Sequence, residues 1–149
     1  MSAVSDKNKQ AIITRLQNND PTFTTLEILG KRFTDLNEFA SALQRNTTLT
    51  ELKLAHNKLQ ESDGVAIAGA LQRNSTLRTV EFVGNRNMGQ VGNAAFARVL
   101  DTNTALTRLI YQKNDLEGNE GAAFARALES NSTLTTLDLV SNGLGEVGG

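Results

Sequence analysis

Apolar and polar residues recur along this chain in one fixed phrase. The stretch 49–59 places leucine at positions 49, 52, 54 and 59, with Asn57 before the last of them. The asparagine returns as Asn85, Asn114 and Asn142, after steps of 28, 29 and 28 residues. Self-similarity at a nearly constant period of this length indicates a solenoid of stacked repeats. The hydrophobic pattern therefore predicts an architecture before any other property is considered.

Each repeat pairs a short strand with a helix. Leu52 and Leu54 alternate with other residues, as one face of a strand does, whereas Ile67, Ala68 and Leu71 follow at helical spacing. Similar units run over 77–103 and 106–131, and a strand at 23–28 precedes a helix near 36–43. One strand and one helix cannot close a core alone, so neighbouring units are expected to bury a continuous one.

We predict one domain over residues 1–149, with a capping helix within 1–21 and about five repeats over 22–149, the last incomplete. The capping helix, near Ser5 to Asn18, is expected to end before Pro21, because the residue before proline avoids the helical region. The fifth repeat begins at Leu134 and shows no helix after its strand. Its uncovered apolar residues and unpaired strand edge predict a homodimer through this C-terminal end, or a longer array of which the chain is a fragment. The uncovered apolar residues are Leu128, Leu137 and Leu139.

Asparagine and glycine mark the turns of each unit. The asparagines after the strands are expected to face the interior, where one amide can pair with backbone groups of two units. Lys31 takes this place in the first unit and is expected in solvent. Asn46 is expected to close its helix in the left-handed conformation. Glycines at 64, 92, 121 and 149 are expected to ease the turn from loop to helix.

Composition excludes several classes of partner. The formal net charge is −1 and the 15 Lys and Arg residues are scattered, which argues against nucleic acid and against an anionic membrane surface. No apolar run approaches the roughly 20 residues of a membrane-spanning helix. The polar opening, MSAVSDKNKQ, does not resemble a secretory signal, and the chain has no cysteine. We therefore expect a protein of the reducing cytoplasm.

The repeated phrases carry a family resemblance. The stretches L-T-E-L-K-L-A-H-N-K-L and A-L-Q-R-N-S-T-L resemble the ribonuclease-inhibitor type of leucine-rich repeat. That resemblance implies an α/β solenoid, a right-handed βα superhelix with parallel strands on the concave face and helices on the convex face. The opening residues 18–21, together with Glu38, Phe39 and Ala40, resemble the repeat domain of tropomodulins and leiomodins. That family binds the ends of actin filaments, so the resemblance implies actin as a partner.

The residues between the strand leucines are expected to face the concave surface, because side chains alternate along a strand. They form three columns, and the third column is largely apolar although it should face water. Exposed apolar patches on soluble proteins often mark interaction sites. We therefore predict a partner-binding site on this face. Its residues are Glu27, Leu29, Glu51, Lys53, Glu81, Val83, Arg108, Ile110, Gln112, Asp138 and Val140. The bland alternative is a solvated sheet face with incidental small apolar residues.

Other motifs offer weaker sites. Residues 143–148 spell G-x-G-x-x-G, but a dinucleotide site needs a following helix, and the repeat already explains Asn142 and Leu144. His56 is the only histidine, and no spacing joins it to a nucleophile or a zinc shell, so a surface histidine is expected. The carboxylates of the loop 115–120 do not match the EF-hand pattern, and we expect a solvated acidic turn. Asn46, Asn74 and Asn131 stand in glycosylation sequons, which recur because the helix-to-strand turn recurs.

These observations predict a non-enzymatic scaffold, without cofactor or metal, that binds a protein partner through its concave face or a loop rim. A tropomodulin-like module that binds actin, or an effector that targets host proteins, is the alternative. An enzyme is a third class, for which the sequence assembles no site.

Overall fold

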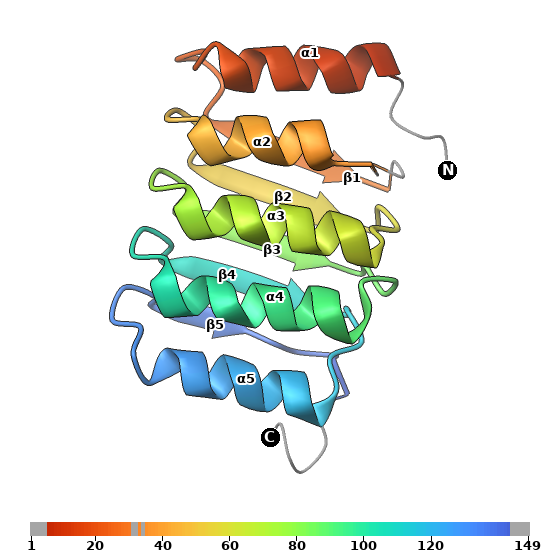
Figure 1. Cartoon of the computed structure of the whole chain (residues 1–149), viewed down its shortest axis with the longest axis vertical. Helices are drawn as coiled ribbons and strands as arrows, with labels where there is room; N and C mark the ends of the chain where they lie inside the picture. The colour runs from red at the N-terminus through yellow and green to blue at the C-terminus, as the bar shows by residue number, and fades with distance from the viewer. Residues whose placement is uncertain (1–5, 31–32, 34, 144–149) are drawn as a thin grey trace.

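The structure is a computed structural model, and it describes residues 6–30, 33 and 35–143. One helix precedes four strand–helix pairs and a final strand (Figure 1). The helices are α1 (Asp6–Gln17), α2 (Asn37–Arg45), α3 (Glu61–Arg73), α4 (Gly89–Thr102) and α5 (Gly118–Leu128). The strands are β1 (Thr25–Leu29), β2 (Glu51–Ala55), β3 (Thr79–Val83), β4 (Arg108–Gln112) and β5 (Thr136–Asp138).

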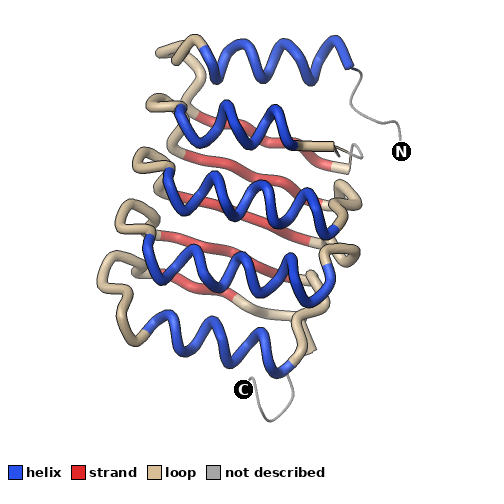
Figure 2. Tube along the Cα trace, viewed as in Figure 1, coloured by secondary structure: helices blue, strands red, loops and turns tan. Residues whose placement is uncertain are grey.

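The strands form one parallel sheet in the order β1-β2-β3-β4-β5, and the helices cover one side of it (Figure 2). The chain winds in a right-handed sense as it passes from strand to helix to the next strand (Figure 1). Packed helices need about 8–10 Å each, whereas parallel strands lie about 4.8 Å apart, so the sheet lies on the inner side of the arc. The prediction of an α/β repeat solenoid with parallel strands is confirmed.

The core lies between the sheet and the helices, where the repeat leucines were expected. Leu52, Val80 and Leu109 are each at most 1% exposed, and they occupy the same position in successive strands. Aromatic rings continue this core toward the last units: Phe82 contacts Phe96 at a centroid distance of 4.5 Å, and Tyr111 lies 5.0 Å from Phe96. Burial of such side chains contributes about 1.5–3 kcal/mol each, so stacking of units, not the single unit, stabilises the fold.

The asparagines after the strands form a ladder in the interior, as predicted. Asn57, Asn85 and Asn114 are completely buried. The amide of Asn85 donates to the carbonyl oxygen of Leu54 at 3.0 Å and accepts from the backbone N–H of Asn57 at 3.0 Å. Each asparagine therefore joins its own unit to the preceding one. The corresponding residue of the first unit, Lys31, lies outside the described residues.

A second asparagine ladder lies at the opposite turns, and here one expectation was wrong. Asn46 follows α2 in an extended conformation (φ −67°, ψ 138°), not in the left-handed region. Its side chain closes the turn instead, because its oxygen accepts from the N–H groups of Thr48 and Leu49 at 3.0 and 2.7 Å. Its amide nitrogen donates to the carbonyl oxygen of Leu16 at 3.0 Å. Equivalent amides follow the next three helices, at Asn74, Asn103 and Asn131.

The end of α1 also has a different cause from the one expected. Asn19 takes the left-handed conformation (φ 49°), and the N–H of Asp20 donates to the carbonyl oxygen of Arg15 at 3.2 Å. The N–H of Asn19 donates to the carbonyl oxygen of Leu16 at 3.2 Å, which completes a Schellman-type end before Pro21 is reached. Ser5, the expected cap of this helix, lies outside the described residues.

Gly64 and Gly92 allow close packing within their helices and do not form the loop-to-helix turn. Gly64 lies inside the first turn of α3, and a Cβ at this position would lie 2.9 Å from the sulfur of Met88 in the next unit. Gly92 and Gly121 likewise lie inside α4 and α5, whereas residue 149 lies outside the described part of the chain. The expectation that these glycines lie in the loop-to-helix turn was therefore wrong, because the helices begin earlier than the pattern indicated.

Candidate functional site

The strand register confirms the three columns on the side of the sheet opposite the helices. We call this surface the helix-free face, and we refer to its three columns of residues as row one, row two and row three. Row one contains Thr25, Glu51, Thr79, Arg108 and Thr136. Row two contains Glu27, Lys53, Glu81, Ile110 and Asp138. Row three contains Leu29, Ala55, Val83 and Gln112, and Val140 follows beyond the paired part of β5.

Exposure differs strongly within these rows. Leu29 and Val140 are 53% and 62% exposed at the two ends of row three, but Ala55 between them is 2% exposed. Ile110 is 7% exposed, since it lies between the carboxylate side chains of Glu81 and Asp138 on the neighbouring strands. The third column, predicted to be largely apolar and to face water, is therefore covered at Ala55, and Leu29 and Val140 are its most exposed apolar residues.

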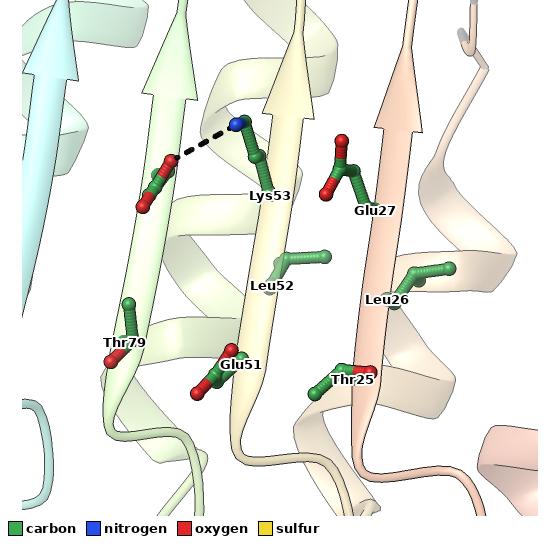
Figure 3. Close-up of a pocket in the computed structure, with 8 residues that line it drawn as sticks. Thr25, Leu26, Glu27, Glu51, Leu52, Lys53 and Thr79 are labelled. Carbon is green, nitrogen blue, oxygen red and sulfur yellow. Dashed lines mark ion pairs between the residues drawn. The ribbon is translucent and has the colours of Figure 1, made fainter.

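Charged side chains of row two are partly paired. The ammonium group of Lys53 lies 3.5 Å from a carboxylate oxygen of Glu81 (Figure 3). Gln112 donates from its amide nitrogen to Asp138 at 2.7 Å, and the backbone N–H of Val140 donates to the other oxygen of Asp138 at 2.9 Å. These contacts hold the side chains at the β2–β3 and β4–β5 boundaries in fixed positions.

Two shallow depressions cover this face. The first is lined by Thr25, Leu26, Glu27, Glu51, Leu52, Lys53, Thr79 and Glu81 (Figure 3). The second is lined by Leu29, Lys53, Ala55, His56, Glu81, Val83, Arg108, Ile110, Gln112 and Asp138. Every residue predicted for the site, except Val140, lines one or both of them. The structure thus brings the predicted residues together, and their role in binding stays a prediction.

His56 lies at the edge of the second depression. It takes the left-handed conformation (φ 55°), as do the residues at the same place in other units, Gly30, Gly84, Lys113 and Ser141. Its ring lies over Gly84, where an added Cβ would come within 2.2 Å of the Nδ1 atom. The histidine is exposed, as expected, and its position follows from the turn after β2.

The acidic loop before α5 differs from the solvated turn that was expected. Asp115 forms an exposed ion pair with Arg86 at 3.7 Å, and Glu117 accepts from the side chain of Gln90 at 3.2 Å. Glu120, in contrast, is 4% exposed, and neither of its carboxylate oxygens has a hydrogen-bond partner. The three carboxylates diverge, and the described residues contain no group of histidines or acids arranged to hold a metal ion.

Glu120 affects the one tyrosine of the chain. Burial, and to a smaller degree the negative charge of Glu120, raise the pKa of Tyr111 well above 10.0. The hydroxyl group of Tyr111 donates to the side-chain oxygen of Asn93 at 2.6 Å, and Asn93 donates to the backbone carbonyl of Asn114 at 3.3 Å. These buried polar groups connect α4 with β4 and with the asparagine ladder, so they have a structural role.

The side chains of the asparagines in the glycosylation sequons form hydrogen bonds within the fold. Asn46 and Asn74 are 2% and 3% exposed, and both atoms of each amide group form hydrogen bonds. A glycan on such an amide would require the turn to open, which supports the expectation that the motif repeats because the turn repeats. For the G-x-G-x-x-G motif, the structure describes Gly143 alone, with φ 68°. Residues 144–149 lie outside the described part of the chain.

A groove on the helical side was not predicted from the sequence. It lies between α4 and α5 and is lined by Ala94, Ala97, Arg98, Asp101, Ala123, Arg126 and Ala127. The signal was present in the similar stretches A-A-F-A-R at 94–98 and 122–126, whose alanines leave space between the two helices. Over the described residues, no helix has the length and apolar character needed to cross a membrane.

Comparison with known proteins agrees with the repeat architecture. A family model described as Leucine Rich repeat matches residues 45–68 and 130–149. No curated protein matches the chain. Among solved structures, a leiomodin-1 domain described as Actin-Binding Site 2 is 27% identical, with a TM-score of 0.73; the match covers 92% of this chain and 80% of that one.

The tropomodulin C-terminal domain of Caenorhabditis elegans is 12% identical, with a TM-score of 0.71, over 87% of this chain and 81% of that one, so this match shows the fold alone. The ribonuclease-inhibitor type of repeat stays a prediction, since neither the family model nor these structures specify it. The chain therefore has a leucine-rich-repeat fold, and it resembles the repeat domains of leiomodin and tropomodulin.

Proposed function

We propose that this chain is a non-enzymatic scaffold that binds a protein partner through its helix-free face or the adjoining loop rim. One observation carries the proposal: two adjoining depressions on one face gather exposed apolar, acidic and basic side chains. Buried polar residues such as Asn85 and Asn114 are hydrogen-bonded within the fold and are not presented to a substrate. Mixed polar and apolar surfaces of this kind are typical of non-obligate protein interfaces.

The test is capture of partners from a cell extract with matched surface variants. Leu29→Ser combined with Glu81→Ala changes the helix-free face, whereas Val65→Ser changes an exposed apolar residue of α3, since Val65 is 42% exposed. We expect quantitative mass spectrometry to show a set of proteins that is lost with the first variant and retained with the second. Equal capture by both variants would contradict the use of this face.

Actin is the second candidate partner. The observation that favours it is the 27% identity over 92% of this chain to a leiomodin-1 domain described as an actin-binding site. Co-sedimentation with actin filaments, together with a filament-end elongation assay, tests this candidate directly. Absence of binding and of any change in elongation rate would leave the general scaffold proposal in place and remove actin.

A further inference from the structure

The helix-free face carries its charge unevenly. Over β1 to β3, the three carboxylates of Glu27, Glu51 and Glu81 face one ammonium group, that of Lys53, which gives a net charge of −2. Over β4 and β5, Arg108 and Asp138 cancel each other. The first depression lies over the acidic half, and its floor contains Leu26 and Leu52 (Figure 3).

Two of the three carboxylates in the acidic half are available to a partner. Glu81 is paired with Lys53, but Glu27 and Glu51 are exposed and form no ion pair or hydrogen bond within the described residues. Glu27 and Glu51 stand on adjacent strands, two positions apart in register. Strand spacing and rise place their Cα atoms about 8 Å apart. A cationic side chain fits between two carboxylates at this separation, and its charge would relieve their mutual repulsion.

An apolar contact adjoins the acidic pair. Leu29 follows Glu27 by two residues on β1, so it lies on the same face at a distance of about 7 Å along the strand, and it is 53% exposed. In an extended peptide, residues two apart are separated by the same length.

We propose that the acidic half of the helix-free face binds an extended, basic segment of a protein partner. A Lys or Arg of that segment lies between Glu27 and Glu51, and an apolar side chain two residues away covers Leu29. This inference rests on the proposed function, because it specifies the chemistry of the partner for the same face. In this arrangement, the carboxylates of the depression over β1–β3 select a positively charged segment. The apolar contact with Leu29 fixes the position of that segment along the strand.

The test uses the full chain and synthetic peptides as probes. The probe is the labelled peptide Gly-Ser-Thr-Lys-Thr-Val-Thr-Ser-Gly, with copies that carry Glu in place of Lys or Ser in place of Val. Binding is followed by NMR titration of the backbone amides. Glu27→Gln with Glu51→Gln removes the two carboxylates, and Glu38→Gln with Glu129→Gln removes two exposed acids elsewhere. Leu29→Ser is matched by Val91→Ser, since both positions are more than half exposed.

We expect the basic peptide to perturb amides of β1 to β3 and the Glu-containing copy to perturb none. Loss of two exposed ion pairs should weaken binding by about three- to tenfold in the Glu27/Glu51 variant, and not in its control. Raising the ionic strength from about 0.05 to 0.5 M should weaken it similarly. Leu29→Ser should weaken binding of the Val peptide and leave that of the Ser peptide unchanged.

Equal binding of the Lys and Glu peptides, or equal loss in the Glu27/Glu51 variant and its control, would overturn this inference. Perturbation confined to the helical side would overturn it as well. If the capture experiment still shows partners that depend on the helix-free face, the scaffold proposal survives that result. If capture shows no dependence on this face, the proposal that the scaffold binds through the helix-free face fails whatever the peptide does.

Discussion

The side-chain oxygen of Asn85 accepts a hydrogen bond from the backbone N–H of Asn57, 3.0 Å away and 28 residues earlier in the sequence. The same relationship joins Asn114 to Asn85 at 2.9 Å and Asn142 to Asn114 at 2.8 Å. Each amide therefore satisfies a buried N–H of the preceding unit, and the repeat period is the length of chain between two rungs of this ladder.

Replacing Asn85 with alanine should destabilise the protein by about 2–4 kcal/mol. The substitution leaves the N–H of Asn57 buried without its partner, at a cost of about 1–3 kcal/mol, and it removes the side-chain hydrogen bond to the carbonyl oxygen of Leu54, which is worth about 1 kcal/mol. Urea unfolding followed by circular dichroism measures the change in the free energy of unfolding. Asn119→Ala, at an exposed position of α5, is the control and should change it by less than about 0.5 kcal/mol. A similar result for the two variants would contradict the ladder.

Gly84 gives a second prediction, because its positive φ and the nearby ring of His56 disfavour a larger residue for two separate reasons. Its φ is 71°, and a Cβ would overlap the ring of His56. Gly84→Ala should destabilise by about 1–2 kcal/mol from left-handed backbone strain, with an added cost from the displaced ring. In a His56→Ala background, the part of the destabilisation that comes from displacing the ring should vanish, and the part that comes from backbone strain should remain. Gly69→Ala, where nothing lies within 4 Å, should instead stabilise α3 by about 0.5–1 kcal/mol. Thermal unfolding of the four variants decides between these effects.

Much of the fold could be predicted because the length of the sequence repeat determines which residues of neighbouring strands pair. A step of 28 residues from Leu52 to Val80 already states that these two side chains stack, and the structure pairs them. The same step located the outward columns, since a strand alternates its faces. The asparagine ladder followed from the need to satisfy buried backbone groups at a recurring turn.

Exposure within the columns could not be predicted in the same way. Ala55 and Ile110 share the outward orientation of Leu29, but neighbouring side chains cover them, and that cover depends on the side chains of the adjacent strands. Glu120 was wrongly predicted to be solvated because it follows other acidic residues in the sequence. It lies within the first turn of α5, where its side chain is directed inward. Asn46 was misassigned because asparagine ends helices in two ways, through its backbone or through its amide.

The contacts of Asp20 with Thr22 and Arg15, just after α1, are expected to be sensitive to acid. Its carboxylate accepts from the hydroxyl and the N–H of Thr22, at 2.7 and 2.9 Å, and from the guanidinium of Arg15 at 2.8 Å. These bonds lower the pKa of Asp20 from 3.8 to about 2. A lowered pKa contributes stability that is present above 3.8 and is lost as the pH falls toward 2.

Carbon-detected NMR titration should therefore show the carboxyl group of Asp20 titrating near pH 2. Asp20→Asn should reduce the fall in melting temperature between the two pKa values, whereas Asp101→Asn, at an exposed position of α4, should not. A normal midpoint for Asp20 would show that the bonds to Thr22 do not persist in solution.

Self-association is predicted by the exposure of the last unit. Leu71 and Leu100 lie in the last turns of α3 and α4 and are 1% exposed, whereas Leu128 at the equivalent repeat position of α5 is 39% exposed. Light scattering at tens of micromolar should give a mass above the 16.1 kDa of one chain. Leu128→Glu should restore the monomer mass, and Val65→Glu, on the exposed side of α3, should not. A single monodisperse monomer for the unchanged chain would remove the predicted homodimer.

Tyr111 links the buried carboxylate of Glu120 to alkaline stability. Burial first, and the charge of Glu120 second, raise the pKa of Tyr111 well above 10.0, so the folded protein keeps the phenol neutral where the unfolded chain ionises it. Stability should therefore fall as the pH rises above 10.0. Tyr111 is the single tyrosine, so its absorbance reports on it alone, and ionisation should coincide with loss of circular dichroism.

Glu120→Gln separates the two causes of this shift. Removing the charge should bring the pKa of Tyr111 closer to its ordinary value, and burial should keep it raised. The same change replaces a buried carboxylate that has no hydrogen-bond partner with a neutral amide, which costs less to bury than a charge, so the free energy of unfolding at neutral pH should rise. Glu117→Gln, three residues earlier and exposed, should alter neither quantity. If Tyr111 ionised near pH 10 while the circular dichroism stayed native, its hydroxyl group would be in contact with water, and the buried link from Tyr111 to Asn93 would not exist in solution.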